Sequence, residues 1–155
     1  MKKTAFFLTA IVTLMMLASC KASRTPINAE DFKTKAEAAE YTVQDALDQF
    51  PAGVANDYLI AFKGTTAIDY QIEFADVPTV EQAVSAYQEN RSKFEEQKGS
   101  SSVQSSVSAG NYSYYKLASN GRYYVISRIE NTFIYIDASV EYKDEIVEFL
   151  RNIGY

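Results

Sequence analysis

Few side chains in this sequence are suited to catalysis, and the missing types narrow the possible chemistry. The chain has no histidine and no tryptophan, and Cys20 is its single cysteine. Without histidine, neither a Ser–His nor a Cys–His nucleophile pair can form. Zinc, copper and haem sites lose their usual His and Cys ligands. The sequence therefore predicts no metal site, no cofactor and no disulfide within the chain.

Carboxylate chemistry remains open, because two acidic side chains are enough to hydrolyse a glycoside. Asp69 and Glu73 alternate with apolar residues and fall on the polar side of a predicted strand. A catalytic pair needs burial or close convergence to separate its two pKa values, and the spacing indicates neither. We therefore expect a chain that is not an enzyme. A carboxylate-dependent hydrolase acting on envelope glycans is the alternative.

Cys20 closes a segment that has the marks of a secretion signal. Two lysines precede an apolar run over residues 5–17, and small residues follow it. That run is shorter than the ~20 apolar residues of a membrane-spanning helix. The four residues Leu17-Ala18-Ser19-Cys20 resemble the lipobox of bacterial lipoproteins. This resemblance implies cleavage before Cys20 by the lipoprotein signal peptidase and a diacylglycerol thioether on the cysteine sulfur.

The lipobox resemblance implies an organisation and a location for the whole chain. Residues 1–19 form a signal peptide, 20–28 a short polar tether, and 29–155 a single domain. Acyl chains such as palmitate would hold the domain at the extracytoplasmic face of the cell membrane, and two or three chains anchor stably. An ordinary secreted protein and an uncleaved anchor helix are the alternatives, and both leave the position of Cys20 to chance.

The acidic balance of the chain argues against other kinds of attachment. There are 15 basic and 20 acidic residues, and loss of Lys2 and Lys3 with the signal leaves 13 against 20, a net charge of about −7. Phosphate backbones and anionic lipid surfaces repel such a domain. We expect no nucleic-acid partner and a membrane contact that depends on the lipid anchor alone.

Hydrophobic periodicity predicts an α+β domain. Helix-like spacing covers three segments, and each helix has a single apolar stripe that needs a sheet face to cover. We expect an antiparallel sheet of five to six strands with about three helices on one face. The predicted helices are 29–40, 79–98 and 142–153, and the predicted strands are 58–62, 68–74, 111–117, 122–129 and 132–138.

For two segments the sequence favours no single secondary structure. Residues 41–48 suit either a strand or a continuation of the first helix, and residues 100–108, with six serines, suit a flexible loop or a weak edge strand. A hairpin followed by a helix occurs at 57–94 and again at 122–153, which predicts a weak structural repeat.

Short capping and turn motifs predict several boundaries of these elements. Asn28 is a good helix N-cap. Thr79 and Gln82 have the spacing of a capping box. Asn120-Gly121 is a strong signal for a tight hairpin turn.

Tyrosine is the conspicuous residue of the predicted sheet. Because neighbouring residues of a strand point to opposite faces, rings are expected on both faces. One interpretation is ordinary packing, since strands favour tyrosine. The other is a binding surface for a protein, peptide or glycan ligand, because tyrosine is a rigid apolar plate with a polar tip. The candidate binding residues are Tyr112, Tyr114, Tyr115, Tyr123, Tyr124 and Tyr135.

Three stretches beyond the lipobox carry a wider resemblance. Residues 111–115, 120–128 and 143–155, together with the lipobox and the short tether, resemble small uncharacterised lipoproteins of low-GC Gram-positive bacteria. The resemblance implies a membrane-anchored module of the cell envelope that binds or interacts and does not catalyse. It transfers no catalytic or binding residue to this chain.

Overall fold

The computed structural model describes residues 23–64 and 69–155. The predicted signal peptide, Cys20 and the tip of the first predicted hairpin lie outside the described residues. Among the helices that are described, none is both long and apolar enough to cross a membrane.

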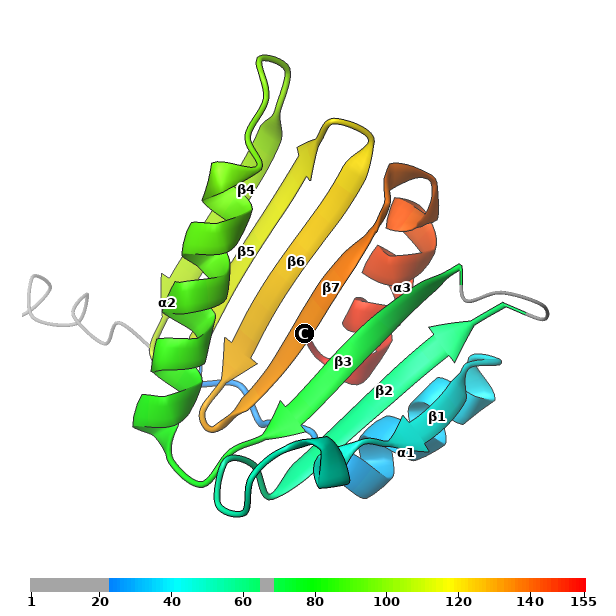
Figure 1. Cartoon of the computed structure of the whole chain (residues 1–155), viewed down its shortest axis with the longest axis vertical. Coiled ribbons are helices and arrows are strands. Elements are labelled where there is room, and N and C mark those ends of the chain that lie inside the picture. The colour runs from blue at the N-terminus through cyan, green and yellow to red at the C-terminus, as the bar shows by residue number, and fades with distance from the viewer. Residues whose placement is uncertain (1–22, 65–68) are drawn as a thin grey trace, which may run out of the picture.

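The described chain folds around a seven-stranded antiparallel sheet, which confirms the α+β class (Figure 1). The sequence predicts five to six strands. The count rises because both open segments are strands, one at each edge of the sheet. The strand order is β1-β2-β3-β7-β6-β5-β4, with β1 Thr42–Asp45, β2 Asp57–Lys63, β3 Tyr70–Asp76, β4 Val103–Ala109, β5 Tyr112–Ser119, β6 Arg122–Ile129 and β7 Thr132–Ser139.

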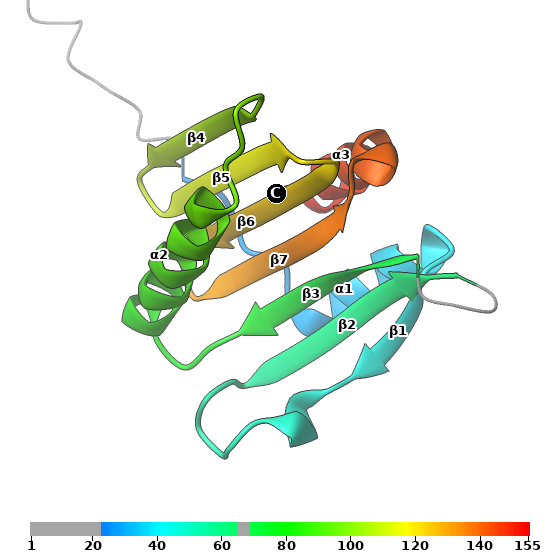
Figure 2. The ribbon, with the colours of Figure 1, turned by 45° about the horizontal axis from the view of Figure 1, so that its top comes forward.

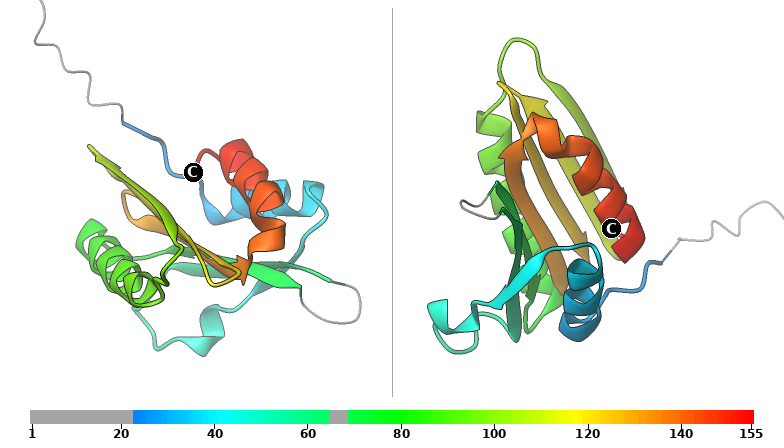
Figure 3. Two further views of the ribbon diagram at one scale, coloured as in Figure 1. Left: turned by 90° about the horizontal axis from the view of Figure 1, so that it is seen from above. Right: turned by 90° about the vertical axis from the view of Figure 1, so that its right-hand side faces the viewer.

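The three helices lie on both faces of the sheet, so the expectation of helices on one face is wrong (Figures 1 and 3). Helices α1 (Ala29–Ala38) and α3 (Lys143–Ile153) cover one face, called here the two-helix face. Helix α2 (Val80–Glu96) packs on the opposite, one-helix face, against β5, β6 and β7. The physical reason is that β5 and β6 carry apolar side chains on both sides, and each side needs a cover.

The predicted repeat is not reflected in the sheet faces on which its two helices lie. In both units a hairpin is followed by a helix, but α2 and α3 lie on opposite faces of the sheet. Strands β3 and β7 are antiparallel neighbours, so a twofold rotation about the sheet normal would superpose one hairpin on the other. That rotation would keep both helices on the same face, which is not observed. Within the described residues there are also two short 3₁₀ turns, η2 (Leu47–Gln49) and η3 (Val140–Tyr142).

Aromatic packing fills the core beneath the two-helix face. Phe32 of α1 is fully buried, and its ring stacks on Phe74 of β3 with the ring centroids 4.8 Å apart. Phe149 of α3 meets the Phe32 ring edge-on at 6.1 Å. These rings join both helices to the centre of the sheet, because each buries a large apolar area in contact with the others.

The predicted local signals are confirmed. The side chain of Asn28 accepts a hydrogen bond from the Asp31 amide at 2.8 Å and caps α1. Thr79 and Gln82 form the full capping box of α2. Asn120 and Gly121 both have positive φ, 52° and 76°, as a tight type I′ hairpin requires.

Residues 24–28, predicted as tether, already contact the domain on the two-helix side (Figure 3). The Arg24 amide donates to Asn111 Oδ1 at 3.0 Å, and Asn111 Nδ2 donates back to the Arg24 carbonyl at 2.7 Å. The Arg24 guanidinium lies 3.7 Å from the centre of the Tyr112 ring, and Ile27 is buried. Only residues 21–23 separate this contact from Cys20, a span of at most about 14 Å.

A buried tyrosine pair predicts loss of stability in alkali. The Tyr41 and Tyr70 hydroxyl oxygens are 2.6 Å apart, and burial, reinforced by Glu145, raises the pKa of Tyr41 to about 12. Burial also raises the pKa of Tyr70. The folded state therefore holds these protons more tightly than the unfolded chain, whose tyrosines titrate near ~10. This stability is present below pH ~10 and is lost as the pH rises toward 12.

For Tyr41 alone the loss amounts to about 2–3 kcal/mol. Urea unfolding measured between pH 8 and 12 is expected to show it, with a smaller pH dependence in Tyr41→Phe. An identical pH dependence in that variant would contradict the assignment.

Candidate functional site

Four of the six candidate tyrosines are core residues. Tyr112 and Tyr123 are 7% and 1% exposed beneath the two-helix face, and Tyr115 and Tyr124 are 1% and 7% exposed beneath α2. The interpretation of these rings as an exposed binding surface is therefore wrong for these four. Tyr114 and Tyr135 are half-buried.

Specific contacts explain how these rings are covered on both faces. Phe94 of α2 packs on Tyr124 with ring centroids 5.0 Å apart. Arg91 of the same helix lies 5.3 Å from the centre of the Tyr115 ring. On the other side, the Arg24 guanidinium covers Tyr112. The rings on both faces of these strands are therefore explained by a sheet that is covered on both faces.

The one-helix face is covered over only part of its width. Helix α2 lies mainly over β5, β6 and β7, and it meets β3 at one end, where Ala83 packs with Ala75. In the described part of the chain, none of α1, α2 and α3 lies over β1, β2 and the rest of β3 on this side (Figures 1 and 3). Cross-strand register places Ile60, Phe62, Gln71, Glu73 and Tyr135 on this uncovered part. All five are half-buried. Apolar and polar side chains therefore share an accessible surface.

A hollow of about 280 Å³ opens in this surface at the junction of β3 and β7. Its lining is Tyr70, Gln71, Glu73, Tyr135 and Asp137. Glu73 accepts a hydrogen bond from Gln71 Nε2 at 2.8 Å and another from the Tyr58 hydroxyl. Asp137 accepts from the Arg122 guanidinium, with Nε at 2.9 Å. The hollow thus combines two carboxylates with the Tyr135 ring.

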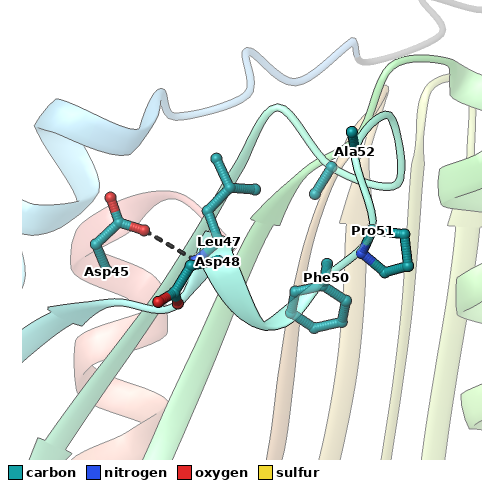
Figure 4. A pocket seen from close by; sticks show the side chains of 7 residues that line it. Asp45, Leu47, Asp48, Phe50, Pro51 and Ala52 are labelled. Atoms are coloured by element: carbon teal, nitrogen blue, oxygen red, sulfur yellow. Dashed lines mark hydrogen bonds between the residues drawn. The ribbon is translucent and has the colours of Figure 1, made fainter.

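A second, larger hollow of about 620 Å³ lies beside η2 at one end of the same surface (Figure 4). The amide of Leu47 donates to Asp45 Oδ1 at 2.9 Å and fixes the turn. Acidic and apolar groups again stand together in the lining, which consists of Asp45, Leu47, Asp48, Phe50, Pro51, Ala52 and Ala55.

Tyr58 connects the two hollows. Its ring packs on Phe50, which lines the larger hollow, with the ring centroids 4.4 Å apart. Its hydroxyl donates to Glu73, which lines the smaller one. Burial, and then the Glu73 carboxylate, raise the pKa of Tyr58, so its hydroxyl stays protonated and remains a donor at neutral pH. We call this surface, from Phe50 through Tyr58 to Tyr135, the open-face site.

The charge of the open-face site is acidic. The residues that line its two hollows include Asp45, Asp48, Glu73 and Asp137 and no lysine or arginine. Arg122 offsets the charge of Asp137 only. Such a surface attracts cationic groups and repels anionic ones.

The other chemistry-bearing residues do not gather into a site. Asp69 is exposed and precedes β3. Arg128 is 6% exposed and donates to the Glu130 carbonyl oxygen at 2.9 Å, which is a structural contact. Across residues 23–64 and 69–155, no three His, Cys, Asp or Glu side chains are grouped so that they could hold a metal ion.

Sequence reasoning named Glu73 and Tyr135 as candidates but missed the rest of the open-face site, although a signal for it exists. Tyr58, Ile60 and Phe62 alternate with Leu59 and Ala61, so β2 is apolar on both faces. Three helices with single stripes cannot cover two faces of a seven-stranded sheet over its whole width. Apolar residues of β2 therefore had to remain partly uncovered.

Comparisons with known proteins identify no family. No protein-family model matches the chain, and no curated protein matches it. Among solved structures, the extracellular domain of PknH from Mycobacterium tuberculosis is similar over 83% of this chain and 92% of that one, with 8% sequence identity and a TM-score of 0.38. A similarity this low indicates neither a shared site nor a shared function.

Proposed function

We propose that this chain is a lipid-anchored, extracytoplasmic module of the cell envelope that binds a cationic segment of a protein or peptide at the open-face site, without catalysis. The observation that carries the proposal is the uncovered half of the one-helix face, where half-buried aromatic rings adjoin carboxylates. The lipobox resemblance supplies the anchor.

The chemistry of the site suits lysine or arginine side chains. Their long apolar stems pack on surfaces such as Ile60 and Phe62, while their charged heads need an acidic partner. Glu73 offers a carboxylate, and the Tyr135 ring beside it offers a face for a cation–π contact. An anionic glycan or a nucleic acid would be repelled by the same carboxylates.

The placement of the tether supports access to this site. Residues 24–28 run along the two-helix side, and the open-face site lies on the opposite side of the sheet. A chain anchored through Cys20 would therefore present the open-face site away from its tether.

Binding of defined peptides tests the proposal. The probes are two labelled twelve-residue peptides, one alternating Lys and Leu and one alternating Glu and Leu, measured by fluorescence anisotropy. We expect the lysine peptide alone to bind. Combining Glu73→Gln with Tyr135→Ala should weaken its binding about 30-fold, equivalent to about 2 kcal/mol.

The matched control is Glu37→Gln, which removes the same charge from an exposed position on α1. It is expected to leave the affinity within about twofold. Equal affinity in the wild type and the double variant would rule out the open-face site, provided that both unfold at the same urea concentration.

The second candidate function is the carboxylate-dependent hydrolase, and one observation favours it. Glu73 and Asp137 line the same hollow, and their diagonal positions on adjacent strands place their Cα atoms about 7–8 Å apart. Side chains on positions this close can bring their carboxyl groups to the separation that an inverting glycosidase uses. Release of reducing sugar ends from purified envelope glycans, lost in both Glu73→Gln and Asp137→Asn, would favour the hydrolase over the binding module.

A further inference from the structure

Strand β4 forms an unusually open edge of the sheet (Figure 2). All seven of its residues are exposed, with Val103 at 73% and Val107 at 48%. One side of the strand pairs with β5. Within residues 23–64 and 69–155, no strand pairs with its outer side. The unpaired N–H and C=O groups of such an edge are a template for another strand.

The usual protections of an edge strand are missing from β4. Proteins blunt their edges with lysine, proline, bulges or very short strands. No charged residue and no proline occurs between Lys98 and Lys116, although the chain carries 20 acids. The opposite edge differs, because β1 has only four residues, includes Asp45 and leads into η2.

We propose that β4 pairs antiparallel with β4 of a second copy of this chain, with Ser106 opposite Ser106 about a twofold axis normal to the sheet. A twofold interface joins one surface to itself, so the patch must be self-complementary. The neutral β4 meets this condition, whereas a charged side chain on it would be repeated on the second copy and bring like charges together in the paired strands. Growth stops at the dimer, because the short acidic β1 edge offers no second site.

The proposed register sorts the side chains by polarity. It sets Val103 opposite Ala109 and Ser105 opposite Val107, on the face that β4 shares with Tyr112 and Tyr114. The apolar side chains of both copies, together with Ser105, then gather on that face. The other face is entirely polar, because Gln104 meets Ser108 there and the two Ser106 side chains meet.

This axis is also compatible with two anchored chains. Rotation about the sheet normal leaves the two-helix faces of both copies, and with them both Arg24 contacts, on the same side. Both tethers could then reach one membrane, a point that rests on the proposed lipid anchor. The pairing itself depends only on β4.

Disulfide trapping in intact cells tests the pairing with the full chain. Directly opposite residues of an antiparallel pair have Cα atoms ~4.5–5.5 Å apart, which suits a disulfide. We expect Ser106→Cys to give at least tenfold more disulfide-linked dimer on a non-reducing gel than Thr42→Cys, an exposed position on the β1 edge. The wild type reports any dimer formed through Cys20.

Two further arms make the result specific. Gln104→Cys and Ser108→Cys should crosslink when the two variants are expressed together. Neither should crosslink alone, because like positions are then about 13 Å apart. Adding Val107→Lys to Ser106→Cys should lower the dimer yield at least tenfold. This exposed edge position tolerates lysine, which an unchanged melting temperature checks. A Ser106→Cys chain that stays monomeric, or a dimer unaffected by Val107→Lys, would overturn the proposal.

Discussion

Replacing Cys20 by alanine is expected to abolish both palmitate labelling and membrane fractionation of the chain. The lipobox resemblance makes the Cys20 sulfur the attachment point of the lipid, and without a thiol no thioether forms. Two or three acyl chains give an anchor that is stable, whereas a single chain binds membranes only marginally.

The measurement is metabolic labelling with palmitate followed by separation of membrane and soluble fractions. Ser23→Ala is the matched control, because it lies close to the lipobox but outside it, and it should label and fractionate like the wild type. If Cys20→Ala kept the label, the lipoprotein assignment would be wrong. The location and membrane partner proposed above would then lose their basis.

Replacing Phe32 by alanine is expected to lower the free energy of unfolding by about 3–5 kcal/mol. Phe32 is fully buried and contacts Phe74 and Phe149, which belong to the inner strand β3 and to α3. Truncation removes both ring contacts and leaves a cavity between α1, α3 and the sheet, since a packed core relaxes only partly. That loss is a large fraction of the stability of a typical domain.

Urea unfolding of the two variants Phe32→Ala and Phe62→Ala tests this expectation with identical chemistry at both sites. Phe62 is only half-buried on the open-face side of β2, so its loss should lower the free energy of unfolding by at most about 1–2 kcal/mol. Similar losses in the two variants would contradict the different burial that the structure assigns to them.

Local features of the fold could be predicted because they depend on neighbouring residues. The N-cap at Asn28, the capping box of Thr79 and Gln82, and the turn at Asn120-Gly121 each involve groups within four residues of one another. The strand over 122–129 was predicted with the bounds that β6 has. Alternation alone was enough there, since the strand lies between two clear turns.

The two edge strands could not be predicted with the same certainty. Residues 42–45 and 103–109 have weak periodicity, and each becomes a strand through pairing with a partner, β2 or β5. The hydrogen bonds that define β4 connect it to β5. The serine-rich composition of β4 does not by itself distinguish a loop from a strand. Tertiary pairing decides between them.

The candidate site shows the same division between local and distant causes. By itself, the sequence determined the acidic charge, the absence of histidine, the segment ending at Cys20 and the order of the three helices and the five inner strands, because these are properties of composition or of near neighbours. It also placed tyrosine rings on both faces of β5 and β6, as strand alternation requires.

Only the tertiary structure decided which of those rings are accessible. Helix α2 lies on the one-helix face and covers Tyr115 and Tyr124, while Tyr112 and Tyr123 are buried in the core beneath the two-helix face. The same placement leaves β2 and β3 open beside Tyr135. The face that a helix covers depends on the summed burial of side chains from distant strands, and no local pattern in the sequence contains that sum.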